Sequence, residues 1–140
     1  HFYNLFFYLT GSGLVESSAS SISSNKSWAR SNENFVATLS FRDGSLATLT
    51  YTSLGSQDFP KESLDIFCDD KVLSIEDFQK FSVVGDSTIR NFTTRNKEKG
   101  HREELEEFAK AIQAGGDCWP IPLNEQIDTT QVALNIERYL

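Results

Sequence analysis

The fold of this chain is decided by one central stretch, Asn34-Phe-Val-Ala-Thr-Leu-Ser-Phe-Arg-Asp-Gly-Ser-Leu-Ala-Thr-Leu-Thr-Tyr-Thr52. Apolar and polar side chains alternate through Asn34–Phe41 and again through Ser45–Thr52. The pair Asp43-Gly44 separates the two runs, and such a pair favours a tight turn because glycine accepts positive φ angles. The stretch therefore predicts a β-hairpin.

Further strands and helices are expected on both sides of this hairpin. Short segments separated by turn residues predict strands over 14–22, 63–68, 71–75, 80–84 and 88–94. Helices are expected over 1–9, over 101–114 and from about residue 124 onward. The second helix has one apolar stripe, formed by Leu105, Phe108, Ala109 and Ile112. The third offers several apolar residues for burial: Ile127, Val132, Ala133, Ile136 and Leu140. A block of strands with helices at its ends predicts one α+β domain over residues 1–140, a mostly antiparallel sheet of about six strands with helices packed on one face.

Composition excludes several classes of protein. The net charge is −7, and thirteen Lys and Arg are scattered among twenty Asp and Glu, which argues against a nucleic-acid partner. The charged run Arg102–Glu107 is interpreted as the solvated face of a helix. The opening apolar run is too short to cross a bilayer, which needs about 20 apolar residues, so no membrane association is expected.

The cysteines and the first residue bear on where the protein works. Cys68 and Cys118 lack the spacing of a zinc site, and we expect two reduced thiols in the cytoplasm, with a single disulfide as the open alternative. The chain begins at His1, inside an aromatic run that ends at Thr10-Gly11, and contains no methionine. We therefore expect it to be a piece of a longer polypeptide. Residues 23–32 predict a loop that carries Trp28.

Catalytic signatures are rare in this sequence. It has no Gly-x-Gly-x-x-Gly, no phosphate-binding loop, no Gly-x-Ser-x-Gly and no metal-ligating histidine pair. Gly11-Ser-Gly13 follows a predicted helix instead of a strand, so it is interpreted as a helix end. His1 and His101 are the two histidines, and by themselves they indicate no reaction.

Three stretches, taken in order, resemble the C-terminal domain of the glucose–fructose oxidoreductase/inositol dehydrogenase (Gfo/Idh/MocA) family of NAD(P)-dependent oxidoreductases. They are His1–Gly11, which is similar to a His-x-x-Asp helix ending in Leu-x-Gly, then Asn34–Tyr51, and then Gly100–Ile112 followed by Pro120–Leu123. The resemblance implies the C-terminal domain of a dehydrogenase that lacks its Rossmann half, and with it the NAD or NADP site. The isolated chain is then expected to be inactive.

The resemblance also implies roles for particular residues. His1 corresponds to the family's acid–base histidine, and Asn4 stands where the family has aspartate. Segments that contact substrate in the family offer Lys61, Lys99, His101 and Arg102 here, so these four residues and Asn4 are expected to bind a sugar, sugar nucleotide or polyol. Neither metal nor cofactor ligands are expected in this chain.

Two functions follow from these expectations. The first is the substrate-binding and oligomerising domain of a sugar dehydrogenase, with the missing Rossmann domain as a partner and self-association through the sheet face that carries Thr38, Ser40, Thr48 and Thr50. The alternative is a non-catalytic binding or dimerisation module, a scaffold or pseudoenzyme, on the same fold. Substrate identity and the choice between NAD and NADP stay open.

Overall fold

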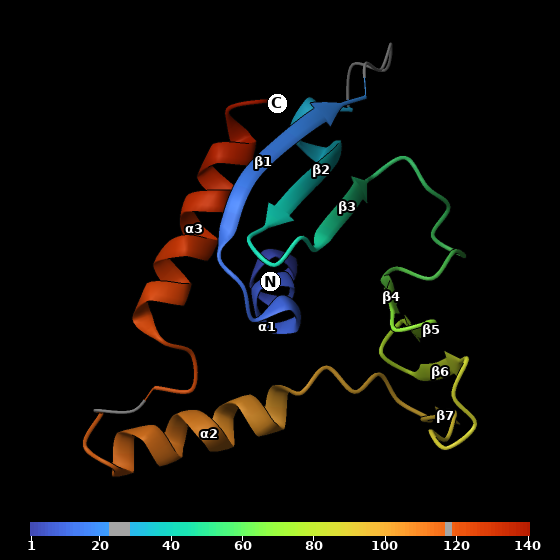
Figure 1. Ribbon diagram of the computed structural model, residues 1–140, viewed down its shortest axis with the longest axis vertical. Helices are drawn as coiled ribbons and strands as arrows, with labels where there is room; N and C mark the ends of the chain where they lie inside the picture. The colour runs from blue at the N-terminus through green and yellow to red at the C-terminus, as the bar shows by residue number, and fades with distance from the viewer. Residues whose placement is uncertain (23–28, 117–118) are drawn as a thin grey trace. The chain divides into compact units, whose positions relative to one another are not determined.

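The structure, a computed structural model, describes residues 1–22, 29–116 and 119–140 of the chain (Figure 1). In chain order the elements are α1 (Phe2–Thr10), β1 (Leu14–Ser21), the short 3-10 helix η1 (Ser31–Glu33), β2 (Asn34–Phe41), β3 (Leu46–Thr52), β4 (Ser63–Cys68), β5 (Lys71–Glu76), β6 (Lys80–Val84), β7 (Phe92–Thr93), α2 (His101–Gln113) and α3 (Leu123–Glu137). The expected helices and strands are confirmed, and β7 is shorter than the predicted strand over 88–94. Most of the predicted loop over 23–32, with Trp28, and also Cys118 lie outside the described residues.

The expected α+β fold with antiparallel strands is confirmed, and the strands are divided between two sheets. One sheet has the order β1-β2-β3 and the other β4-β5-β6-β7. Residues 53–62, which include Gly55 and Pro60, form no strand and connect β3 to β4. The chain forms two compact units, residues 1–55 with 114–140 and residues 56–113.

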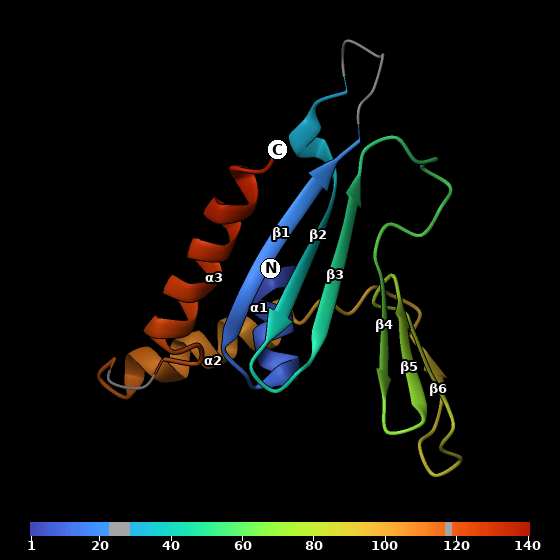
Figure 2. The ribbon, with the colours of Figure 1, turned by 45° about the horizontal axis from the view of Figure 1, so that its top comes forward.

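The core of the first unit lies on one face of its sheet, where β2 is the central strand (Figure 2). Ala37, Leu39 and Phe41 alternate along β2 and are buried. The ring of Phe7 on α1 meets the ring of Phe41 edge to face, with centroids 5.6 Å apart. α3 contacts both α1 and β1 and buries Val132 and Ile136, each 2% exposed. Two helices therefore cover this sheet through apolar side chains.

The turn of the predicted hairpin has the conformation that its sequence demands. Gly44 has a φ of 90° and its N–H donates to the Phe41 carbonyl at 3.0 Å. The Asp43 carboxylate accepts hydrogen bonds from the Ser45 hydroxyl at 2.7 Å and the Ser45 backbone N–H at 3.1 Å, and these bonds lower the pKa of Asp43. The turn thus aligns β2 and β3, so that Thr38 lies opposite Thr48 and Ala37 opposite Leu49.

The second sheet is built from three hairpins in succession. Its registers align Leu64, Ile75, Phe81 and Phe92 across four strands, and the Phe81 and Phe92 rings lie 5.3 Å apart. This row of apolar side chains joins the strands side by side. Cys68, at the end of β4, is a free and exposed cysteine.

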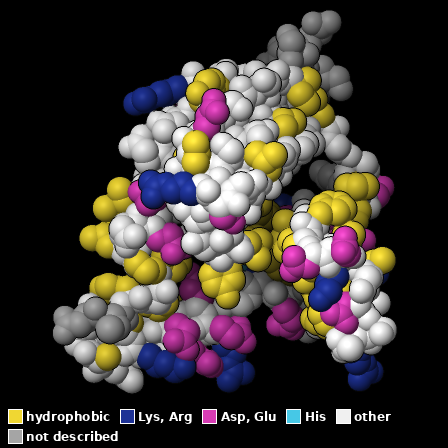
Figure 3. All heavy atoms as spheres, viewed as in Figure 1, with side chains coloured by type: hydrophobic (Ala, Val, Ile, Leu, Met, Phe, Trp, Pro, Cys, Tyr) yellow, Lys and Arg dark blue, Asp and Glu magenta, His cyan; other side chains and the backbone are white. Residues whose placement is uncertain are grey.

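The predicted apolar stripe is partly buried on α3, whereas the stripe predicted on α2 (Leu105, Phe108, Ala109 and Ile112) is exposed. On α3, Val132 and Ile136 are buried while Ile127 is exposed. On α2 the buried residue is Ala111, whereas Leu105 and Ile112 are 68% and 55% exposed. Acidic and basic side chains also lie on α2, toward the bottom of the view in Figure 3. No helix within the described residues is both long enough and apolar enough to cross a bilayer.

Candidate functional site

His1 and Asn4 lie at the start of α1. His1 is exposed at the N-cap position, and its carbonyl accepts a hydrogen bond from the Leu5 N–H at 2.9 Å. The helix ends at Gly11, which adopts the left-handed conformation and returns its N–H to the Phe7 carbonyl at 2.8 Å. The predicted acid–base histidine and the predicted sugar-binding amide therefore share one helical turn.

Asn4 has a partner that the sequence analysis did not identify. Its side-chain amide donates to the Glu125 carboxylate on α3, with Nδ2 and Oε1 2.8 Å apart. An acidic residue in the first turn of a helix is common because it complements the helix dipole, so sequence alone does not distinguish Glu125 as a site residue. Burial, and to a smaller extent the charge of Glu137, raises the pKa of neighbouring Tyr3.

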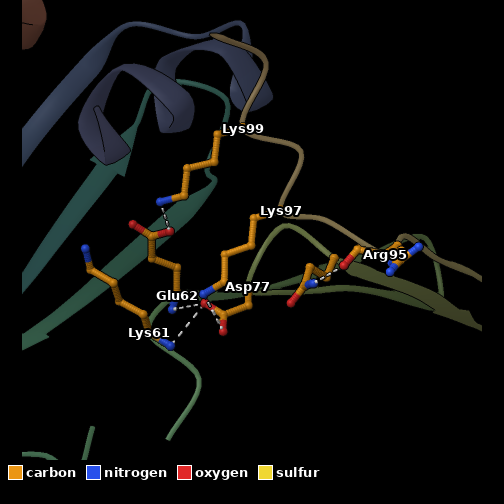
Figure 4. Close-up of polar contacts among 7 residues, drawn as sticks. Lys61, Glu62, Asp77, Arg95, Lys97 and Lys99 are labelled. Carbon is orange, nitrogen blue, oxygen red and sulfur yellow. Dashed lines mark hydrogen bonds and ion pairs between the residues drawn. The ribbon is translucent and has the colours of Figure 1, made fainter. Parts of the chain in front are cut away.

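The lysines predicted to bind substrate belong to a second group of residues, in the second unit (Figure 4). We define the lysine cluster as Lys61, Lys97 and Lys99 with the carboxylates of Glu62 and Asp77. Lys97 pairs with Asp77 at 3.0 Å and Lys99 with Glu62 at 2.5 Å. The Asp77 carboxylate also accepts the backbone N–H groups of Lys61 at 3.1 Å and Glu62 at 3.4 Å.

The β5–β6 turn holds the lysine cluster together. Asp77 and Phe78 have φ angles of 53° and 54°, a conformation that is rare for bulky residues. The ammonium of Lys99 lies 5.3 Å from the centroid of the Phe78 ring, a cation–π geometry. The Lys61 side chain extends away from Asp77 in Figure 4, and the described residues provide no ion pair for its ammonium.

His101 and Arg102 begin α2 and are exposed. Arg102 pairs with Glu106 one turn along the same helix, with Nε and Oε1 2.7 Å apart. The structure thus places Lys61 and Lys99 in one cluster, and leaves Arg102 on a solvated helix face. Sequence analysis did not single out Glu62, Asp77 or Lys97, because their contacts join segments far apart in the chain.

Other parts of the described chain contribute little to this site. A hollow of about 310 Å³ lies on the second sheet and is lined by Ser63, Asp65, Ser74, Ile75, Glu76, Lys80 and Ser82, none of them a predicted site residue. Across residues 1–22, 29–116 and 119–140, no three or more His, Cys, Asp and Glu residues are grouped so that they could hold a metal ion.

The Asp77–Lys97 pair makes a pH-dependent prediction. The Lys97 ammonium is the main cause that lowers the pKa of Asp77, and hydrogen bonds from Glu62 and Lys61 add to it. A lowered pKa stabilises the fold above the ordinary aspartate pKa, about 3.9, and this contribution is lost as the pH falls through the folded-state value. Replacing Lys97 with glutamine is therefore expected to raise the pKa of Asp77, as measured by NMR titration of its carboxyl carbon.

The control for this titration is Arg95→Gln, because Arg95 contributes its backbone carbonyl, and not its charge, to the neighbouring Gln79 amide at 3.1 Å. The Arg95 variant should leave the titration of Asp77 unchanged. An equal shift in both variants would mean that general charge, and not the contact with Lys97, sets the pKa of Asp77.

Comparison with known proteins gives a fold. No family model matches the sequence, and no curated protein matches it. Among solved structures, UDP-N-acetylglucosamine 3-dehydrogenase GnnA from Acidithiobacillus ferrooxidans is similar over 100% of this chain and 46% of its own, with a TM-score of 0.74 and 19% identity. A putative oxidoreductase from Thermotoga maritima is similar over 99% of this chain and 42% of its own, with a TM-score of 0.73 and 16% identity.

A third solved structure is the WlbA dehydrogenase from Bordetella pertussis in complex with NADH and UDP-GlcNAcA, with a TM-score of 0.56, 16% identity, and coverage of 99% of this chain and 40% of its own. The chain thus spans less than half the length of these proteins, and its fold is one that dehydrogenases contain. The neighbours are oxidoreductases of the Gfo/Idh/MocA type, which confirms the fold that the sequence resemblance implies.

Proposed function

We propose that this chain is the C-terminal, substrate-side domain of an NAD(P)-dependent oxidoreductase that acts on a sugar, sugar nucleotide or polyol. The observation that carries the proposal is the shared fold: the whole chain matches less than half of GnnA with a TM-score of 0.74. The Asn4 amide offers hydrogen bonds of the kind that a sugar requires. The Lys61 ammonium, which has no ion pair among the described residues, offers positive charge of the kind that a phosphate requires.

His1 is the proposed proton carrier, because imidazole exchanges protons near neutral pH. In the reaction the carbinol carbon loses a hydride, and the proton of its hydroxyl passes to His1. We assign Asn4 in the first unit to binding a sugar hydroxyl. In the second unit we assign Lys61, Lys99, His101 and Arg102 to substrate binding. NAD or NADP, held by a Rossmann domain, would supply the hydride acceptor. Since the chain has no Gly-x-Gly-x-x-Gly, we assign none of its residues to that cofactor.

The proposed partners are a Rossmann domain and further copies of the same chain. The outer face of the first sheet carries Thr38, Ser40, Thr48 and Thr50, with Leu46 exposed beside them. Short threonine and serine side chains let another sheet approach this face closely, so we propose self-association through it. The cytoplasm, where nicotinamide cofactors are available, is the proposed location.

A non-catalytic binding module is the second candidate. It is favoured by Asn4, which occupies the position of the family's aspartate and carries no charge. Turnover distinguishes the two candidates: a longer polypeptide that joins this chain to a nucleotide-binding domain should reduce NAD or NADP when a sugar nucleotide is added. Binding of the sugar nucleotide without any turnover would favour the module.

Binding of a sugar nucleotide tests the proposal on this chain directly. We expect titration with UDP-N-acetylglucosamine to shift the amide resonances of Lys61, Lys99 and His101 in NMR spectra. Lys61→Ala should raise the Kd about tenfold, the effect of losing one charged hydrogen bond. This variant keeps the backbone N–H that binds Asp77 and removes an ammonium with no ion pair among the described residues.

Lys110→Ala is the matched control, because Lys110 lies on α2 and pairs with Glu107. Its Kd should equal that of the unmodified chain. If UDP-N-acetylglucosamine shifts no resonance at millimolar concentration, or if both lysine variants weaken binding equally, the proposed substrate site is wrong.

A further inference from the structure

The contact between Asn4 and Glu125 determines how the Asn4 amide is oriented. A carboxylate accepts hydrogen bonds and donates none, so the NH₂ group of Asn4, and not its carbonyl oxygen, must face Oε1 at 2.8 Å. The carbonyl oxygen of Asn4 therefore points away from Glu125, and the described residues donate no hydrogen bond to it. Both side chains are half-buried. The amide is thus held in one orientation, with an acceptor on its free side.

The side of α3 that carries Glu125 changes from apolar to polar residues toward the N-terminus of the helix. Glu125, Thr129, Val132 and Ile136 follow the spacing that places residues on one side of a helix. Val132 and Ile136 are buried, and the Thr129 hydroxyl is buried without a hydrogen-bond partner among the described residues. An unpaired buried hydroxyl is unusual in a protein interior. One turn from Glu125, α3 therefore carries a buried polar group that the described residues do not satisfy.

We propose that Glu125 is a positioning residue that presents Asn4 to a ligand as a hydrogen-bond acceptor. The second carboxylate oxygen of Glu125, for which the described residues provide no partner, is an acceptor as well. These two acceptor oxygens recognise groups that donate hydrogen bonds. The part of the ligand that binds to them is therefore a diol of an uncharged sugar ring. A phosphate or carboxylate would be repelled by Glu125. This inference rests on the proposed function, whose substrate class it narrows.

The ligand-free chain provides the first test. In NMR spectra of the ligand-free chain, Glu125→Gln should shift the side-chain NH₂ resonances of Asn4, because the substitution replaces the charged acceptor at 2.8 Å with a neutral amide. The matched control is Asp128→Asn, which changes an exposed carboxylate on the same helix and should leave these resonances unchanged. An Asn4 amide that does not respond to Glu125 would overturn the positioning role.

Ligand binding provides the second test, with UDP-N-acetylglucosamine as the probe. Glu125→Gln should raise the Kd about tenfold, because the glutamine amide lets Asn4 turn its NH₂ group outward and lose the acceptor. Asp128→Asn should bind like the unmodified chain. The double variant Asn4→Asp with Glu125→Gln exchanges the amide and the carboxylate, so that one donor again faces one acceptor. Its Kd should return to within about threefold of that of the unmodified chain.

Recovery in the double variant, with all variants folded to the same melting temperature, separates ligand recognition from a merely structural contact. If Glu125→Gln binds the probe as tightly as the unmodified chain, the inference is overturned. If the unmodified chain does not bind the probe, the proposed function fails for sugar nucleotides and the hydroxyl-binding role fails with it. The ligand-free spectra still show in that case whether Glu125 holds Asn4, so the two failures are distinguishable.

Discussion

Replacing Gly85 with alanine is expected to destabilise the second unit by about 3 kcal/mol or more, because it combines a backbone clash with a strained φ angle. Gly85 has a φ of 94°, and a Cβ at this position would lie 2.5 Å from the Asp70 carbonyl oxygen and 3.2 Å from the Lys71 Cα. These are backbone atoms of the β4–β5 turn. They cannot rotate aside as a flexible side chain would.

The clash is difficult to relieve because the two turns are tied together. Asp86, the next residue, pairs with Lys71 at 2.9 Å, so moving Gly85 away from Asp70 would also pull on this ion pair. Asp70 itself has a φ of 60°, which leaves the β4–β5 turn few alternative conformations. Slow-exchanging amides of β4, β5 and β6, followed by hydrogen exchange under increasing urea, measure the loss in this unit.

Gly55→Ala is the matched control for Gly85→Ala. A Cβ on Gly55 would meet nothing within 4 Å. The control should change stability little, or raise it by about 0.5 kcal/mol through the reduced freedom of the unfolded chain. Equal stability of the Gly85 and Gly55 variants would contradict the close approach of the two turns.

Replacing Asn34 with alanine is expected to cost the first unit about 3 kcal/mol, because it removes a fully buried side chain that hydrogen-bonds the backbone of Arg30 and Ser53. Asn34 is 0% exposed. Its NH₂ group donates to the Arg30 carbonyl at 3.0 Å, and its carbonyl oxygen accepts the Ser53 N–H at 3.0 Å and the Thr52 hydroxyl at 2.9 Å. One side chain thus joins the entry of β2 to the exit of β3.

Urea unfolding followed by circular dichroism measures this loss, with Asn32→Ala as the control. Asn32 is exposed, and its side chain makes one long hydrogen bond of 3.4 Å, to Glu137. The control should stay within about 0.5 kcal/mol of the unmodified chain. If Asn34→Ala were as mild as Asn32→Ala, water would have to satisfy Ser53 and Arg30 in its place.

Much of the fold could be predicted because its signals are local. The Asp43-Gly44 turn, the alternation along β2 and β3, and Gly11 after α1 each act within a few residues, and the structure has the expected element at each place. The candidate site could be predicted in part. His1 and Asn4 share a helical turn because they are three residues apart, and this follows from helix geometry.

The carboxylates that complete the Asn4 contact and the lysine cluster could not be predicted in this way. Glu125 lies 121 positions from Asn4, and Glu62 lies 37 positions from Lys99. A carboxylate at the start of a helix or on a loop has the same local pattern whether it binds solvent or a distant side chain. Which residues of α2 are buried could not be predicted either, because the spacing of apolar residues indicates an apolar stripe but not which other element covers it.

The sequence by itself determined the α+β class, the positions of the strands and helices, and the turns that join neighbouring strands, because backbone propensities and side-chain periodicity act over short distances. Only the tertiary structure decided that the strands form two sheets, that Asp77 gathers the lysine cluster, and that Glu125 orients Asn4. Those outcomes depend on contacts between segments far apart in the chain, whose free energy is gained only when the whole unit has folded.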